Sequence, residues 1–332
     1  MTKLVNIGPP AGMVRGICQT AGAWNLIDDT RVSLARRGVI EAVRRHNTAA
    51  IFDWLLNALS FQGISDSIAA GYMNKHGRVR WNDIAVALAA TPNCPKLRCY
   101  WSFSECNNRK TAAICANPSL RPTCPLPQHN LRNGRLNQTA YSLFFFIRDI
   151  AGGDFVGWLD RQLAAVAAGP TSDRPARLRQ ALLEPLGHVH GVSNKVLAMA
   201  LSDLLIAADA KRPAWIEAGS VMIAIDTLVH NFLHRTGILG DIGAEHAYGP
   251  RCYAENGCAA IIERIAGKID ARHYNPAFPA NFPRFVQHAI WRFCAEAGLN
   301  RCNGRRIDDR APCAQSDCPM FTNCARVPLK PT

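Results

Sequence analysis

The chain has 332 residues, of which 48% are hydrophobic and 19% charged, and its net charge is +13. This composition excludes an intrinsically disordered chain, and the longest apolar runs, such as Tyr141 to Ile147, are far shorter than the about 20 residues of a membrane-spanning helix. The positive charge favours a polyanionic partner, nucleic acid before an anionic membrane surface. The first residues lack a signal-peptide pattern, so we expect a protein of the cell interior.

Apolar residues recur at helical spacing along most of the chain, and no segment alternates with the period of a β-strand. We therefore predict an all-α fold. An irregular insertion is expected at about 90–135, which is rich in Cys, Pro, Asn and Arg, and the last 50 residues are expected to be irregular too. Helices are expected at 31–47, 51–59, from Pro175 to Gly187, over 196–205, and after Asp226 as far as Gly237.

The segment HVHGVSNK, residues 188–195, joins two of these helices through a short turn. Gly191 permits a backbone conformation that other residues resist, and exposed amide groups in such a turn can meet a DNA phosphate. Lys195 places a cation at a helix start, where the amide dipoles already leave positive charge. It is therefore either a surface or phosphate-contacting cation, or an amine whose position favours loss of the proton and nucleophilic attack.

Two other polar residues stand at helix ends. Asp226 begins a predicted helix, where its simplest role is that of an N-cap. Gln62 follows an apolar helix in a polar loop. The chain thus presents LLNALSFQGISD, GVSNKVLAMAL and IDTLVHNFLHRTGI in this order.

This ordered set resembles the helix–hairpin–helix (HhH-GPD) DNA glycosylase superfamily, above all its endonuclease III branch, with a lysine as in the 8-oxoguanine glycosylases. The resemblance implies a two-lobed fold. A six-helix barrel lobe would cover 48–218, including the Cys-rich insertion. The second lobe would combine 1–47 with 219–332 and carry a loop that binds a [4Fe–4S] cluster.

The resemblance also implies roles for single residues. Lys195 matches the nucleophilic lysine, Asp226 the catalytic aspartate, and Gln62 the residue that fills the gap left by an extruded base. Gly191 and Ser193 belong to the hairpin that contacts DNA. Ser193 stands where the family has a second hairpin glycine, His190 replaces a proline, and Leu228 stands where a histidine usually follows the Asp-Thr pair.

Four cysteines close the chain with ten, four and five residues between them: Cys302, Cys313, Cys318 and Cys324. Four thiolates suit a [4Fe–4S] cluster, because each iron takes one sulfur ligand, and they also suit a structural zinc ion. The resemblance favours the cluster, since CPMFTNC matches the end of the family's cluster loop. It leaves Cys294 as a spare candidate for the first ligand, and it directs Arg305 and Arg306 towards the DNA backbone.

Five more cysteines fall within the insertion: Cys94, Cys99, Cys106, Cys115 and Cys124. Clustered cysteines in a reducing compartment favour a metal site over disulfides. Cys99, Cys106, Cys115 and Cys124 are the candidate ligands of a second metal, zinc or iron–sulfur, and scattered buried thiols are the alternative. We expect the insertion to reshape the base pocket or to contact additional DNA.

The predicted function is excision of a damaged or modified base from double-stranded DNA by a monomeric, nucleoid-associated enzyme. The base would be flipped out of the stack, Asp226 would stabilise the positive charge on the sugar, and Lys195 would attack C1′ and then support strand cleavage as an AP lyase. One alternative is a monofunctional glycosylase that removes hypermodified bases, as in phage defence. The other is a non-catalytic DNA-binding protein. Oxidised pyrimidines are the default substrate.

Overall fold

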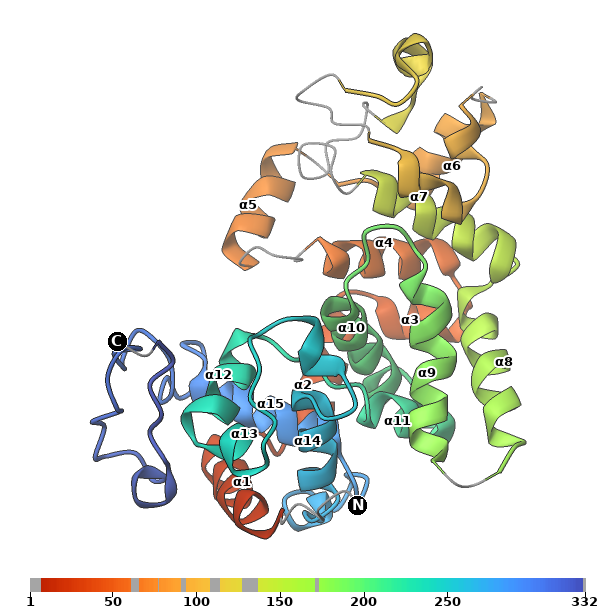
Figure 1. The fold of residues 1–332 in the computed structure, drawn as a ribbon. Helices are drawn as coiled ribbons and strands as arrows, with labels where there is room; N and C mark the ends of the chain where they lie inside the picture. Colours follow the sequence, from red (N-terminus) through yellow and green to blue (C-terminus); the bar gives the residue numbers. More distant parts are fainter. Residues whose placement is uncertain are drawn as a thin grey trace. The chain divides into compact units, whose positions relative to one another are not determined.

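The computed structural model describes residues 7–60, 66–76, 78–90, 94–107, 114–126, 137–170 and 173–330. Helices dominate these residues, and no β-strand of two or more residues occurs among them, which confirms the predicted all-α class (Figure 1). Within the described part of the chain, no helix is both long and apolar enough to cross a bilayer. The chain forms two compact units, one of Met1–Asp29 with Gly219–Thr332 and one of Thr30–Ala218.

The N-terminal boundary differs from the predicted one at residue 48. Residues 30–47 belong to the central unit, because α3 (Val39–Arg44) packs against α4 (Thr48–Leu59). The single helix expected over 31–47 is also wrong. Helix α2 (Leu26–Arg36) ends before Gly38, whose φ of 71° is left-handed and therefore breaks the helix.

Helix α4 lies at the centre of the central unit and contacts α3, α6, α8 and α10. Its apolar residues Ile51, Phe52 and Leu55 are buried, and Asn47 caps it by accepting a hydrogen bond from the Ala50 amide at 3.1 Å. The other helices of the unit are α5 (Asp66–His76), α6 (Trp81–Ala89), α7 (Asn137–Phe145), α8 (Phe155–Ala167), α9 (Arg174–Gly187), α10 (Asn194–Ala207) and α11 (Pro213–Ser220), which crosses the unit boundary.

The described part of the insertion consists of loops and the 3₁₀ turns η1 (Pro95–Leu97), η2 (Tyr100–Glu105) and η3 (Pro118–Thr123), so its predicted irregularity is confirmed there. It packs on α7, where the Ser142 hydroxyl donates to the Tyr100 carbonyl at 2.6 Å. Phe103 is fully buried and stacks with Phe145 at a centroid distance of 6.1 Å.

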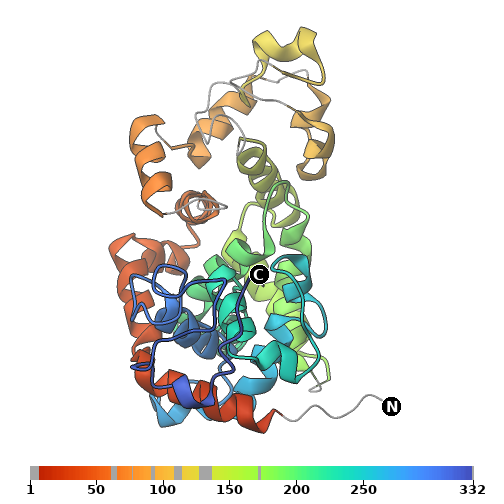
Figure 2. The same ribbon diagram turned by 60° about the vertical axis from the view of Figure 1, so that its left-hand side comes forward.

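In the terminal unit, α15 (Pro283–Cys294) packs against α1 (Gly8–Ala21), α12 (Thr227–Arg235) and α14 (Cys258–Ala266) (Figure 1). Helix α13 (Ile238–Asp241) follows α12. The expectation that the last 50 residues are irregular is thus wrong for 283–294, whose apolar side chains are buried. After α15 the described chain runs as loops with one 3₁₀ turn, η9 (Phe321–Asn323) (Figure 2).

The hairpin between α9 and α10 has the conformation expected from the sequence. Gly191 has a φ of 74°, and a Cβ atom at this position would lie 2.5 Å from Oγ1 of Thr139 on α7. The His190 amide donates to the Ser142 hydroxyl at 3.0 Å, so the turn is attached to α7. Glycine is required here both by the left-handed backbone and by the close approach of α7.

We predict that Gly191→Ala destabilises the protein by roughly 1–3 kcal/mol, because alanine resists this backbone conformation and its Cβ would collide with Thr139. Gly187→Ala is the matched control, since that glycine is helical and a Cβ there meets nothing within 4 Å. The control should stabilise the protein by about 0.4–1 kcal/mol. Urea midpoints measure both variants, and an equal response would contradict the assigned role of Gly191.

Candidate functional site

Lys195 is the second residue of α10 and is partly exposed. Val196 and Leu197, which follow it, are buried and hold the first turn of the helix against the core of the central unit. Ser193 is the N-cap residue, although its side chain makes no capping hydrogen bond. Lys195 therefore stands directly after the hairpin. Gln62 lies outside the described residues.

Asp226 is the N-cap of α12, and its Oδ1 accepts a hydrogen bond from the Val229 amide at 2.9 Å. The N-cap interpretation from the sequence is thus confirmed. Asp226 is partly exposed and stands at the N-terminal, positive end of the helix dipole. Asp226 belongs to the terminal unit and Lys195 to the central unit.

The four C-terminal cysteines line one cavity, together with apolar residues such as Phe232 and Phe293. Four cysteine thiolates can hold either a structural zinc ion or a [4Fe–4S] cluster, in which each thiolate binds a different iron.

Arg235 lines the same cavity and is fully buried. Its Nη2 donates to Asp309 at 2.8 Å, whereas Nη1 has no hydrogen-bond partner within the described structure. A buried guanidinium nitrogen without an acceptor is costly, and Arg235 lines the cavity of the four cysteines.

Backbone amides are directed at the cysteine sulfurs. Cys318 accepts from the Met320 amide and Cys324 from the Arg326 amide, and both bonds oppose the burial that raises the two pKa values. Cys294 is completely buried and donates to Cys302, which with Arg235 lowers the pKa of Cys302 although burial opposes this. Cys302 itself lines the cavity, so the structure favours Cys302 over Cys294 as a ligand.

Three of the other inserted cysteines lie near Cys124. Burial raises the pKa of Cys124 to about 11, and Cys94, Cys106 and Cys115 contribute to the rise. Cys94 is therefore a further candidate ligand beside the predicted Cys99, Cys106, Cys115 and Cys124. Amides are again directed at sulfur, with Leu126 donating to Cys124 and Asn117 to Cys115 at 3.3 Å.

The sequence interpretation missed a group formed by His230, His246, Cys252 and Cys258. Burial, followed by the charges of His246 and His234, lowers the pKa of His230 to about 4, so its imidazole is neutral at neutral pH. The signal that could have revealed the group is a second pair of cysteines with two histidines upstream. It was overlooked because five residues separate the cysteines rather than two.

Arg305 and Arg306 are exposed on the loop that carries the C-terminal cysteines. Arg305 forms an ion pair with Glu296. Arg306 donates to Gln315 at 3.3 Å, and Gln315 donates back to the Arg306 carbonyl at 2.9 Å. Both cations are accessible, and the partners of Arg306 order the loop.

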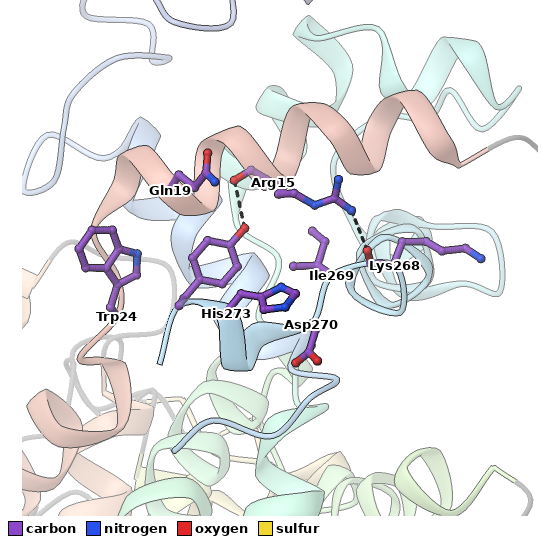
Figure 3. A pocket seen from close by; sticks show the side chains of 8 residues that line it. Arg15, Gln19, Trp24, Lys268, Ile269, Asp270 and His273 are labelled. Atoms are coloured by element: carbon purple, nitrogen blue, oxygen red, sulfur yellow. Dashed lines mark hydrogen bonds between the residues drawn. The ribbon is translucent and has the colours of Figure 1, made fainter. Parts of the chain in front are cut away.

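A pocket of about 720 Å³ lies between α1 and residues 268–274, and it includes none of the predicted site residues (Figure 3). Its polar groups contact one another. Arg15 donates to the Lys268 carbonyl at 3.0 Å, and the Tyr274 hydroxyl donates to the Arg15 carbonyl at 3.2 Å. These bonds attach α1 to the chain before α15, so we assign the pocket a structural role.

Comparisons with protein-family models, with curated proteins and with solved structures found no match. The resemblance to the helix–hairpin–helix glycosylases therefore rests on the motifs themselves and stays a prediction. The positions of Lys195 and Asp226 are the structural facts on which it can be tested.

We predict that Asp226→Ala lowers the free energy of unfolding by about 1 kcal/mol, because the cap of α12 is lost. Asp226→Asn should change it by only a few tenths of a kcal/mol, since the asparagine oxygen can still accept from the Val229 amide. Urea midpoints of the terminal unit measure both. Equal destabilisation by the two variants would show that the charge, and not the cap, is what stabilises the helix.

Proposed function

We propose that the chain is a DNA glycosylase with AP-lyase activity that excises a damaged or modified base from double-stranded DNA. The observation that carries the proposal is the partly exposed Lys195 on the first turn of α10, directly after the left-handed Gly191. The net charge of +13 supports a DNA partner.

In the proposed reaction the target nucleotide leaves the stack and Gln62 fills its place. The Lys195 amine, once neutral, forms a bond to C1′ while the glycosidic bond breaks and the base leaves with the bonding electrons and takes up a proton. The carboxylate of Asp226 stabilises the positive charge that develops on the sugar. Ring opening gives an imine between Lys195 and C1′, and loss of a C2′ proton then expels the 3′ phosphate.

We further propose that Cys302, Cys313, Cys318 and Cys324 hold a [4Fe–4S] cluster. The cavity that the four cysteines share and the unpartnered Nη1 of Arg235 support this. The cluster would cross-link the loop after α15 and supply the anion that Arg235 faces. Arg305 and Arg306 would then contact DNA phosphates from a fixed loop.

For the insertion we propose a second metal, zinc or iron–sulfur, bound by Cys99, Cys106, Cys115 and Cys124, with Cys94 as a further candidate ligand. The amides directed at Cys115 and Cys124 support it. A bound metal would order a segment that contains no α-helix in its described parts. The insertion would then be rigid enough to shape the base pocket.

Borohydride trapping on a duplex with a preformed abasic site tests the catalytic proposal without knowledge of the base. Wild type should give a covalent adduct, and Lys195→Ala should give none, because Lys195 supplies the attacking amine in the proposed reaction. Lys211→Ala, at an exposed lysine of the same unit, is the control and should retain the adduct. Absence of an adduct in wild type, with tight binding that weakens in salt, would favour the monofunctional or purely DNA-binding alternative.

Iron and acid-labile sulfide of anaerobically purified protein test the cluster. We expect Cys302→Ser to lose about four iron atoms per chain, the content of one cubane cluster. Cys294→Ser should keep them, because Cys294 donates to Cys302 and does not line the cavity. Zinc in place of iron, or loss of iron only in Cys294→Ser, would contradict the assigned cluster or its ligands.

A further inference from the structure

His230, His246, Cys252 and Cys258 take no part in the proposed reaction, yet their ligand atoms all lie within 4.8 Å of one another in the terminal unit. His230 belongs to α12, Cys252 to the 3₁₀ turn η7 (Pro250–Tyr253), and Cys258 begins α14. His246 lies in the loop between α13 and η7. Three of the four are buried and His246 is partly exposed.

The distances between these atoms match a single tetrahedral zinc ion. With Zn–S of about 2.3 Å and Zn–N of 2.0–2.1 Å, a tetrahedron places nitrogen and sulfur ligands about 3.6 Å apart. Nδ1 of His230 lies 3.3 Å from the Cys258 sulfur and 3.6 Å from the Cys252 sulfur. Nε2 of His246 lies 3.4 Å from the Cys258 sulfur.

The hydrogen bonding of His246 prepares it to bind a metal. Its Nδ1 lies 2.7 Å from the carbonyl oxygen of Ala244. Because a carbonyl only accepts, Nδ1 carries the proton and the lone pair is on Nε2, the nitrogen that faces Cys258. A histidine that donates its other nitrogen to a backbone carbonyl is a common arrangement around bound metals.

Other occupants fit less well. In a Rieske cluster the two histidines bind one iron and the two cysteines the other, whereas here His230 contacts both sulfurs. A disulfide between Cys252 and Cys258 would not explain why a nitrogen of His230 and a nitrogen of His246 lie so close to the sulfurs. Zinc with two thiolates and two neutral imidazoles is electrically neutral, which suits a buried site. Four protein ligands leave no position for a substrate, so the site is structural.

The loop that contains His246 and Cys252 also forms hydrogen bonds to Ile225, the residue before Asp226. Between α13 and α14 run 16 residues, 242–257, with η7 as their only helical element. From this loop the Tyr253 hydroxyl accepts from the Ile225 amide at 2.9 Å and donates to the Ile225 carbonyl at 3.4 Å. The Tyr248 hydroxyl lies 3.5 Å from the same carbonyl.

We propose that His230, His246, Cys252 and Cys258 bind one structural zinc ion, and that this ion holds the loop 242–257 so that Tyr248 and Tyr253 fix the backbone at Ile225 and thereby position Asp226. The importance of that position rests on the proposed catalytic role of Asp226. His230 stands one turn after Asp226 on the same helix, so the ion connects both sides of the aspartate to one point.

Metal analysis of the full chain tests the zinc site. His246→Ala and Cys252→Ser should each lose one equivalent of zinc relative to wild type and keep the iron. His234→Ala is the matched control on α12, since His234 pairs with Glu245 at 2.6 Å, and Cys18→Ser is the control for a buried cysteine. Both controls should keep the zinc. If Cys252→Ser does not fold, the partly exposed His246 still provides the test.

Hydrogen exchange of the peptide that contains Ile225 tests the positioning. Loss of zinc in His246→Ala should make the Ile225 amide exchange about tenfold faster, as expected when one hydrogen bond is lost. Tyr253→Phe should keep the zinc and show the same faster exchange. Neither readout uses DNA, so failure of the glycosylase proposal leaves both interpretable.

Three results would overturn the proposal. Equal zinc in wild type and both ligand variants, or a zinc-free wild type with a Cys252–Cys258 disulfide in peptide maps, would remove the metal site. Zinc loss with unchanged exchange at Ile225 would leave a zinc site that does not position Asp226.

Discussion

Long segments without regular secondary structure lack helix hydrogen bonds, so other interactions must hold them in place. Much of this structure depends on those interactions. Within the part of the chain that the structure describes, three such segments contain cysteines: the described parts of the insertion, the loop 242–257, and the chain after α15. Each contains cysteines that gather in the folded protein, at Cys124, at Cys258 and in the cavity beside Arg235. A metal bound to thiolates substitutes for a hydrophobic core where a segment has too few apolar residues to bury.

The two proposed catalytic residues both stand at the N-terminus of a helix, with opposite consequences. A negative side chain is favourable at this end of a helix and a positive one is unfavourable. The Asp226 carboxylate accepts from the Val229 amide, which holds it in one orientation. Lys195 stands in the first turn of α10, directly after the hairpin.

Polar interactions at the end of α12 attach the C-terminal segment to this helix. Arg235 is buried between Asp309 and the cysteine cavity, and the Thr236 and Arg235 carbonyls accept from the Ala325 and Val327 amides at 3.2 and 2.9 Å. The end of α12 therefore holds the C-terminal segment, while its start carries Asp226. A structural change would therefore be transmitted to Asp226 through α12 from two places. One is the cavity of the C-terminal cysteines, and the other is the group of His230, His246, Cys252 and Cys258.

The sequence by itself determined the all-α class, the hairpin with its left-handed glycine, the cap of α12 and the irregular insertion. Helical spacing, capping residues and glycine are local signals, and they act through the chain's own neighbouring residues. Only the tertiary structure decided that residues 30–47 join the central unit and that 283–294 form a helix. It also decided that Cys94 lies near Cys124 and that two histidines meet Cys252 and Cys258. These outcomes depend on which distant segments pack together, and the spacing of residues along the chain does not specify this packing.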